Sequence, residues 1–415
     1  MTTGESITLT VREQVLLAEY TTLGLGGPAA HFIEAGSDDQ VIASVREADL
    51  SGEPVLVLGG GSNLVVADEG FPGTVVHMAT RSVEVRSGRD GAAVAVAAGE
   101  DWDSLVEFCV EEGLSGLECL SGIPGLTGAT PIQNVGAYGQ EVAETIVTVR
   151  AYDRLLDRPV ELANADCGFG YRTSAFKRRA EAGPRAGMTR AGMTRAGMTR
   201  AGMIRAGMTG AGMTRAAPSR AAISPAAATG RFVVLGVTFR LARDPLSAPV
   251  GYAELARVLG VGEGGRVPLG DARSAVLALR RGKGMVLDPG DPDTRSAGSF
   301  FTNPVLDRRQ FAEVERRAAA MSGRPGQEVS VPHFAAADGQ VKVPAAWLIE
   351  HAGFVRGYPA DGSARISSKH TLALTNPGGA SAASLVALAR EIRNGVRQAF
   401  DVELVSEPVL VGAEL

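Results

Sequence analysis

Short apolar runs and stretches with helical periodicity occur along the whole chain, and together they predict a mixed α and β protein. Strands are expected at the apolar or alternating runs 54–58 (PVLVL), 73–77 (GTVVH) and 92–98 (AAVAVAA). Amphipathic helices are expected at 102–112 and 383–400, where apolar residues recur with helical spacing. Because strands and helices do not alternate regularly, the pattern favours an α+β architecture over a doubly wound sheet.

A tandem five-residue repeat interrupts this pattern. AGMTR or a close variant begins at Ala186, Ala191, Ala196, Ala201, Ala206 and Ala211. Each repeat turns about 140° on a helix and changes face on a strand, so the methionines cannot line one side. Because a glycine in every unit raises the entropy lost on ordering, we predict a disordered insertion at about 181–229. A methionine-rich surface that binds a partner is the alternative.

The sequence after the repeat indicates where it is inserted. Residues 231–240 (RFVVLGVTFR) form a mostly apolar run, partly with alternating apolar and polar positions, as is typical of a buried strand. We therefore expect a loop insertion between two strand-like segments, not a linker between domains. A surface hairpin tolerates such an insertion, because each doubling of loop length costs only about 0.6 kcal/mol.

Composition limits the class of protein. The chain has 415 residues, of which 45% are hydrophobic and 21% charged, enough for two or three packed domains. Its first residues, MTTGESITLTVREQ, lack a basic stretch and an apolar run, and no window approaches the roughly eighteen apolar residues that span a bilayer. Cys109, Cys119 and Cys167 lack CxxC spacing and are expected to be packing residues. We expect a cytoplasmic protein without membrane insertion.

Charge and histidine spacing argue against two further classes. Residues 178–230 hold nine arginines and one acid, a net +8 that leaves −13 on the rest of a chain whose total is −5. An acidic body and an arginine-bearing stretch without aromatics do not predict nucleic-acid binding. The five histidines show no HxxxH pair and no acid or cysteine cluster with metal-ligand spacing, so no metal is expected.

Two glycine-rich segments carry the first chemical signal. Gly59, Gly60, Gly61, Ser62 and Asn63 follow the PVLVL run and precede a strand-like LVVA rather than a helix. This is not a Rossmann turn, but consecutive glycines can form a nest of N–H groups for a pyrophosphate. A tight glycine turn is the alternative.

The second segment, residues 121–139 (SGIPGLTGATPIQNVGAYG), is too long and glycine-rich for a simple turn. The two segments together could bind a ligand as long as FAD. One loop would lie at the pyrophosphate, and the other would let backbone approach the flavin ring. A mobile lid is the alternative.

These motifs resemble those of the UDP-N-acetylenolpyruvoylglucosamine reductase (MurB) family. GGGSN, IPG and PIQNVGAYG resemble its flavin signatures, and further family-like motifs follow in the family's order at 167–177, 296–305, 342–353 and 403–412. The resemblance implies NADPH-dependent reduction of UDP-N-acetylenolpyruvoylglucosamine to UDP-N-acetylmuramate through FAD, a step of peptidoglycan precursor synthesis. The partner implied is a nucleotide-sugar substrate, and no protein partner is implied.

The resemblance also implies a fold, a vanillyl-alcohol-oxidase-type FAD module of two α/β subdomains with a C-terminal α+β substrate domain. FAD subdomain 1 would comprise 1–79 completed by 402–415, subdomain 2 would comprise 80–287, and the substrate domain 288–401. The implied FAD-binding residues, besides Gly59 to Asn63, come from the second segment: Ile123, Pro124, Gly125, Thr130, Gln133, Asn134, Gly136, Ala137 and Tyr138.

Catalytic roles follow from the reaction that the resemblance implies. Negative charge develops on the substrate's α carbon and carboxylate, so catalysis requires a cationic donor and a proton donor. Arg172 would stabilise that charge through a planar fork, and Ser299 would protonate the α carbon. Glu407 would be the acidic partner. In this chain a proline follows the glutamate, whereas in the family a proline precedes it, and Glu403 is the alternative.

Substrate binding is implied for Tyr252, Lys283 and Asn303, each of which has a structural alternative. Tyr252 lies in PVGYAEL, a segment similar to the tyrosine loop of the family's first structural type. Two other interpretations remain open at this point: another FAD-dependent oxidoreductase of the same fold, such as an oxidase, and a non-catalytic flavin-binding protein.

Overall fold

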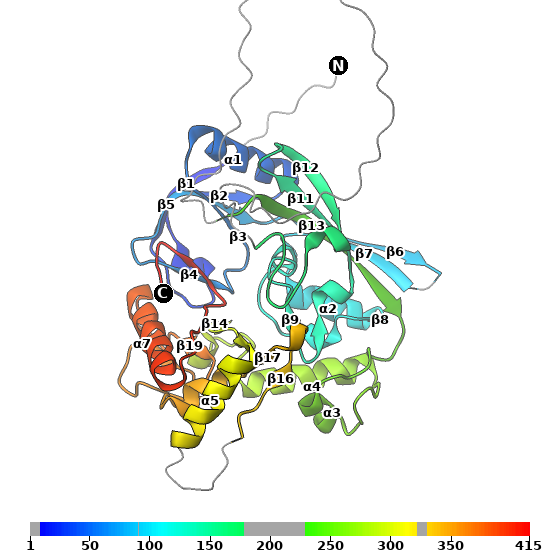
Figure 1. Ribbon diagram of the computed structural model, residues 1–415. Coiled ribbons are helices and arrows are strands. Elements are labelled where there is room, and N and C mark those ends of the chain that lie inside the picture. Colours follow the sequence, from blue (N-terminus) through cyan, green and yellow to red (C-terminus); the bar gives the residue numbers. More distant parts are fainter. Residues whose placement is uncertain (1–8, 90, 178–228, 322–329) are drawn as a thin grey trace, which may run out of the picture.

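The computed structural model describes residues 9–89, 91–177, 229–321 and 330–415 (Figure 1). The AGMTR repeat, for which we predicted disorder, lies outside the described residues. In the part of the chain that is described, no helix has the length and apolar character needed to cross a membrane.

The amino-terminal sheet combines an antiparallel edge strand with three parallel strands in the order β1-β2-β5-β3. Its strands are β1 (Val11–Leu16), β2 (Pro28–Ala35), β3 (Val55–Leu58) and β5 (Phe71–Met78). Helix α1 (Asp38–Ser51) connects β2 to β3; it begins where the Ser37 side chain accepts a hydrogen bond from the Gln40 N–H, and ends at left-handed Gly52.

The carboxy-terminal strand completes this region. Strand β20 (Val409–Val411) pairs in parallel with β4 (Leu64–Val66), which follows the GGGSN turn. Val411 is buried in one hydrophobic cluster with Leu58 and Val75. The last residues of the chain are thereby held beside the first glycine-rich loop.

A six-stranded antiparallel sheet forms the middle of the molecule, with the order β12-β11-β13-β7-β6 and β8 paired to the end of β13. Its strands are β6 (Val83–Gly88), β7 (Gly91–Ala97), β8 (Leu114–Ser115), β11 (Ile146–Asp153), β12 (Arg158–Ala163) and β13 (Phe232–Arg243). Strands β9 (Gly136–Ala137) and β10 (Gln140–Glu141) form a separate hairpin.

Helix α2 (Trp102–Glu111) packs onto the core of this sheet. Its buried residues Trp102, Leu105, Val106 and Cys109 recur at helical spacing, and the Asp101 side chain caps its amino terminus by accepting from the Ser104 N–H. All three cysteines are buried and free, which confirms their interpretation as packing residues.

The carboxy-terminal part consists of small sheets and helices. The sheets are β14-β19-β18, with β14 (Ser296–Ser299), β18 (Arg365–Ile366) and β19 (Ala373–Thr375), and β15-β17-β16, with β15 (Val305–Leu306), β16 (Phe334–Ala335) and β17 (Val341–Lys342). The helices are α5 (Arg308–Met321), α6 (Ala345–His351) and α7 (Ala382–Phe400), while α3 (Ala253–Leu259) and α4 (Leu269–Gly282) precede this part. In Figure 1, α5 and α7 lie on the opposite side of the molecule from α1.

The predicted strands and helices are confirmed, with bounds that differ by a few residues at most, and the GGGSN turn does join two strands. The predicted hairpin around the repeat is wrong. Strand β12 pairs with one edge of β11, so β13 pairs with the other edge of β11 and with β7 instead of with β12. After β12 the chain forms a 3-10 helix (Asn164–Cys167) and irregular backbone before the insertion, not a strand.

Candidate active site

One cavity of about 770 Å³ collects residues from distant parts of the sequence, within the range typical of small-molecule sites. Its walls are formed by the GGGSN turn, the second glycine-rich segment, the residues on both sides of the insertion, the segment after α4, strand β14 and the carboxy-terminal residues.

The two glycine-rich loops touch through their backbones. A Cβ on Gly60 would lie 2.9 Å from the Cα of Gly125, and a Cβ on Gly61 would lie 1.9 Å from the carbonyl oxygen of Tyr20. Gly61 (φ 60°) and Gly125 (φ 127°) also have conformations that favour glycine. At these glycines a side chain would collide with neighbouring backbone, so the two loops can approach closely only with glycine there. Consecutive glycines of this kind suit a nest of N–H groups for a pyrophosphate.

Most of the predicted FAD-binding residues line this cavity: Gly59, Gly60, Gly61, Ser62, Asn63, Ile123, Pro124, Gly125, Thr130, Gln133 and Gly136. Three others are not among its lining residues. Asn134 is buried, and its side chain donates to Glu141 and to the carbonyl of Gly170 and accepts from the Ala143 N–H, so it holds the loop together. Ala137 and Tyr138 belong to the neighbouring hairpin and its turn.

Glu407 sits where three cavity-lining segments meet. Its N–H donates to the Phe300 carbonyl over 2.8 Å, and its own carbonyl accepts 3.4 Å hydrogen bonds from the side chains of Asn63 and Gln133. The residue before it, Ser406, forms an isolated antiparallel bridge with Phe301. The backbone of Glu407 is thus fixed by both glycine-rich loops and by the segment that follows Ser299.

Arg172 lies next to Glu407 in the wall of the cavity. Its Nε lies 3.1 Å from the Glu407 Oε1, close enough for an ion pair, but the N–H is not directed at that oxygen and has no hydrogen-bond partner among the described residues. Its Nη2 donates to the Gly136 carbonyl over 2.8 Å and its Nη1 to the Asn134 carbonyl over 3.4 Å. The guanidinium is thus oriented by backbone of the second loop, and one buried donor is left for a ligand.

Lys177 supports the backbone of Arg172. Arg172 has a left-handed conformation (φ 52°), uncommon for a non-glycine residue, and its carbonyl accepts a 3.1 Å hydrogen bond from the Lys177 Nζ. Burial raises the pKa of Glu407, and the positive charges of Arg172 and Lys177 act in the opposite direction. Burial likewise lowers the pKa of Lys177. These shifts indicate a desolvated group of charges.

Ser299 ends strand β14 on the wall of the same cavity. It is opposite Ala373 of β19 in the sheet register, and the next residue, Phe300, donates its N–H to the Leu372 carbonyl over 2.7 Å. Pairing on one side with β19 and on the other with the Ser406–Glu407 segment makes this a rigid support for a hydroxyl group. The three predicted catalytic residues therefore line one cavity, whereas Glu403 is exposed and outside it.

Tyr252 and Lys283 form a second group beside the cavity, outside its lining. The rings of Tyr138 and Tyr252 lie 5.5 Å apart, and the Lys283 Nζ lies 5.7 Å from the Tyr138 ring centroid. Lys283 also pairs with Glu254 at 2.7 Å. Asn303 is outside the lining of the cavity: its Oδ1 accepts from the Ala345 N–H at the start of α6, and it also hydrogen-bonds with Tyr171, the residue before Arg172.

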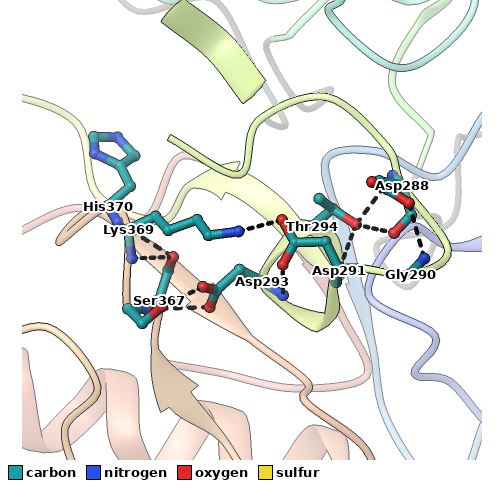
Figure 2. A network of polar contacts seen from close by, with 9 residues as sticks. Asp288, Gly290, Asp291, Asp293, Thr294, Ser367, Lys369 and His370 are labelled. Carbon is teal, nitrogen blue, oxygen red and sulfur yellow. Dashed lines mark hydrogen bonds and ion pairs between the residues drawn. The ribbon is translucent and has the colours of Figure 1, made fainter. Parts of the chain in front are cut away.

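A polar network holds the wall between α4 and β14. In Figure 2 the segment with Asp288, Asp291 and Thr294 lies against the segment with Ser367, Lys369 and His370. The Thr294 Oγ1 lies 2.9 Å from the Asp288 carbonyl oxygen and 2.8 Å from that of Asp291, and it can donate its one proton to either. The Lys369 Nζ pairs with Asp291 at 2.5 Å. The imidazole of His370 points away from this network. Because Thr294 also lines the cavity, the network fixes that part of its wall.

Two cavity-lining cations were not predicted from the sequence, Lys177 and Arg280. Lys177 belongs to the same motif as Arg172, but it lies on irregular backbone, where no periodicity indicates the direction of a side chain. Arg280 precedes Lys283 by three residues at the end of α4. That helical spacing could have placed both on the same side.

The fold and this cavity are those of an FAD-dependent oxidoreductase, and comparisons with known proteins agree. A family model for an FAD binding domain matches residues 29–155, and one for the UDP-N-acetylenolpyruvoylglucosamine reductase C-terminal domain matches residues 291–411. The chain belongs to the UDP-N-acetylenolpyruvoylglucosamine reductase family, and the α+β fold predicted from that resemblance is confirmed.

Relatives match along nearly the whole chain. The UDP-N-acetylenolpyruvoylglucosamine reductase of Thermobifida fusca is 51% identical over 99% of this chain and 100% of its own length. The reductase of Streptomyces coelicolor is 51% identical over 96% of this chain and 90% of its own length. A crystal structure of the MurB protein of Thermus caldophilus superposes with a TM-score of 0.56 at 22% identity, covering 97% of this chain and 99% of that chain, which shows the shared fold.

Proposed function

We propose that this chain catalyses the NADPH-dependent reduction of UDP-N-acetylenolpyruvoylglucosamine to UDP-N-acetylmuramate, with Arg172, Ser299 and Glu407 as its catalytic residues. The observation that carries the proposal is the presence of these three side chains in one cavity, whose other walls are the two glycine-rich loops. Relatives at 51% identity over nearly the full chain support the same reaction. The reaction would supply a peptidoglycan precursor in the cytoplasm, where nucleotide sugars are made.

The residues present fit FAD as the cofactor. Gly59, Gly60, Gly61 and Gly125 line the cavity, and backbone N–H groups of such a glycine-rich turn can bind a pyrophosphate. Bound FAD supplies the redox chemistry, accepting two electrons from NADPH and passing them to the enolpyruvyl double bond. No second dinucleotide fold is needed if NADPH and the substrate use the same cavity in turn.

Arg172 binds the carboxylate of the enolpyruvyl group and stabilises the negative charge that develops there. Its buried Nε lies 3.1 Å from the Glu407 Oε1 but makes no hydrogen bond among the described residues, so its N–H can donate to that carboxylate. Glu407 lies beside the same position with a raised pKa. In its protonated form it can donate a hydrogen bond there without repulsion between like charges.

Ser299 holds a proton at Oγ for the α carbon of the substrate. A proton donor must keep a fixed distance from the atom that it protonates, and the end of β14 that carries Ser299 is held by β19 on one side and by the Ser406–Glu407 segment on the other. The remaining substrate would extend toward Lys283 and Tyr252, whose ammonium and phenol groups suit a diphosphate and a sugar. Asn303 would contact the substrate only if its capping contact with Ala345 were replaced.

Anaerobic half-reactions test this proposal. The purified protein should show flavin absorption bands, lose them on mixing with NADPH, and regain them on mixing with UDP-N-acetylenolpyruvoylglucosamine. Reoxidation by oxygen alone, with none by the enolpyruvyl ether, would favour an oxidase of the same fold. A protein that binds flavin but is not reduced by NADPH would be a flavin-binding module, and one without flavin bands would contradict the whole proposal.

A further inference from the structure

Glu254 neutralises the ammonium group of Lys283 beside the cavity. Its Oε2 lies 2.7 Å from the Lys283 Nζ, and each of the two side chains is 33% exposed. Burial alone would lower the pKa of Lys283, but the hydrogen bond to Glu254 and the nearby negative charges outweigh it, so the pKa is raised. The Glu254 carboxylate is therefore the main group that balances the charge of this lysine.

The fold does not depend on this ion pair. Glu254 belongs to α3 and Lys283 follows α4, and the two helices pack through a buried apolar cluster that contains Val250, Leu255 and Val276. A partly exposed ion pair adds little to the stability of such packing. The pair therefore matters more for what Lys283 can bind than for how α3 is held.

Cations gather around Lys283. Burial, followed by the positive charges of Lys283, Arg356 and Arg280, lowers the pKa of His370 to about 4. These three cations thus lie around one buried, neutral imidazole. Such a concentration of positive charge favours the binding of an anionic group in this region.

The chemistry of the proposed substrate indicates which anion that is. A UDP-sugar with an enolpyruvyl ether has two anionic groups, a carboxylate and a diphosphate. In the proposed function the carboxylate binds Arg172 inside the cavity, whereas Lys283 lies outside the cavity lining, so the diphosphate is the group left for Lys283. A diphosphate at Lys283 would also lie beside Glu254, and these like charges would repel each other.

We propose that Glu254 competes with the diphosphate of the nucleotide sugar for Lys283, so that binding has to break the ion pair between Glu254 and Lys283. Substrate and product carry the same diphosphate, so Glu254 weakens the binding of both and favours release of the product. The inference rests on the proposed function, which supplies a nucleotide sugar as the ligand.

The test is the dissociation constant of the oxidised holoenzyme for UDP-N-acetylmuramate, UDP and uridine, measured by isothermal titration calorimetry. The proteins are the wild type, Glu254→Gln and the control Glu263→Gln, which changes an exposed acid between α3 and α4. Glu254→Gln should bind UDP-N-acetylmuramate and UDP roughly two- to fivefold more tightly, as expected for loss of a partly exposed ion pair. Its affinity for uridine, which has no phosphate, should not change, and Glu263→Gln should bind all three like the wild type.

A Lys283→Met background shows whether Glu254 acts through Lys283. In that background Glu254→Gln should change the affinity for UDP-N-acetylmuramate less than twofold, because no ammonium group is left to compete for. An undiminished gain would mean that Glu254 repels the ligand directly, and the inference would be wrong.

A gain below twofold in Glu254→Gln, or weaker binding, would overturn the inference, and weaker binding would assign Glu254 to orienting Lys283 or the ligand. An equal gain for uridine would also overturn it, because the effect would not depend on phosphate. If Glu254→Gln is not isolated as a folded holoenzyme, Glu254→Ala takes its place with the same expectations, and failure of both would make Glu254 a structural residue. A wild type that binds neither UDP nor UDP-N-acetylmuramate would instead contradict the proposed function.

Discussion

The Nε of Arg172 lies 3.1 Å from the Oε1 of Glu407, which joins the segment before the insertion to the carboxy-terminal segment. The Arg172 guanidinium is also held by the carbonyls of Gly136 and Asn134. A planar fork with several donors can make all of these contacts and still reach a ligand, whereas an ammonium group cannot.

Arg172→Lys should therefore reduce turnover by roughly 10² or more while FAD remains bound, because it keeps the charge but loses the fork. Steady-state turnover and the flavin spectrum measure the two effects. Arg158→Lys, at an exposed position of β12, is the matched control and should be neutral. Near-normal turnover of Arg172→Lys would mean that Arg172 does not act on the substrate.

Glu407 predicts a dependence of stability on pH. Because burial raises its pKa in the folded protein, the folded state binds a proton more tightly than the unfolded state. The protonated Glu407 carboxyl contributes fully to the free energy of unfolding below its pKa in the unfolded chain, about 4.5. That contribution is lost as pH rises through the higher pKa of the folded protein. Glu407→Gln should therefore become more stable relative to the wild type as pH rises through this window. Thermal melts of both holoenzymes across pH would measure the difference, and a constant difference would contradict the raised pKa.

His370 predicts a dependence of the opposite sign. Burial, followed by the charges of Lys283, Arg356 and Arg280, lowers its pKa to about 4. The unfolded chain therefore binds a proton that the folded protein does not, and stability falls as pH drops from about 6.5 to 4. In His370→Gln the free energy of unfolding should therefore fall less steeply over this pH range. Nuclear magnetic resonance of labelled histidines should show His370 neutral at pH 6, and a titration near 6.5 would contradict the prediction.

The repeat offers a prediction about the insertion. The described residue that follows it, Thr229, accepts a 2.6 Å hydrogen bond from the Val57 N–H through its Oγ1, and its carbonyl accepts from Arg154. A deletion should keep this anchor, so Glu181 is best joined directly to Thr229. We expect turnover within tenfold of the wild type and a stability loss no larger than the 1 to 2 kcal/mol scale of a point mutation.

A Gly/Ser linker of the same length as the deleted segment is the control for chain length. If the deletion fails but the linker variant works, the junction was too short. If both variants lose activity or stability, the repeat itself has a function.

Local patterns predicted much of this fold, and motif order predicted the family. The runs 54–58 and 92–98 became strands because alternating or continuous apolar residues have one stable way to be buried. The hairpin around the repeat was wrong, since no local pattern records which edge of β11 is already occupied by β12. Pairing between distant segments is set by the whole sheet.

The site shows the same limit. Motif position indicated Arg172 and Ser299, but the location of Glu407 depends on a bridge between Ser406 and Phe301 that no local pattern predicts. A motif also does not give the direction of a side chain: Asn134 belongs to a flavin-like signature, yet its amide binds Glu141 and its own loop. Arg280 was missed because a buried arginine and a surface arginine look alike in sequence.

Ser299 separates the two halves of the proposed reaction. Its hydroxyl is needed only when the substrate's α carbon takes a proton, so reduction of the flavin by NADPH should not depend on it. In Ser299→Ala, stopped-flow bleaching of the flavin by NADPH should stay near the wild-type rate, whereas reoxidation by substrate should slow by roughly 10² to 10⁴, as expected for loss of a general acid. If both rates fall together, Ser299 supports the flavin or the fold; if neither falls, another group or a water donates the proton. Ser299→Cys should recover part of the second half-reaction because a thiol can also supply a proton, and no recovery would make the geometry of the hydroxyl, rather than its acidity, the decisive property.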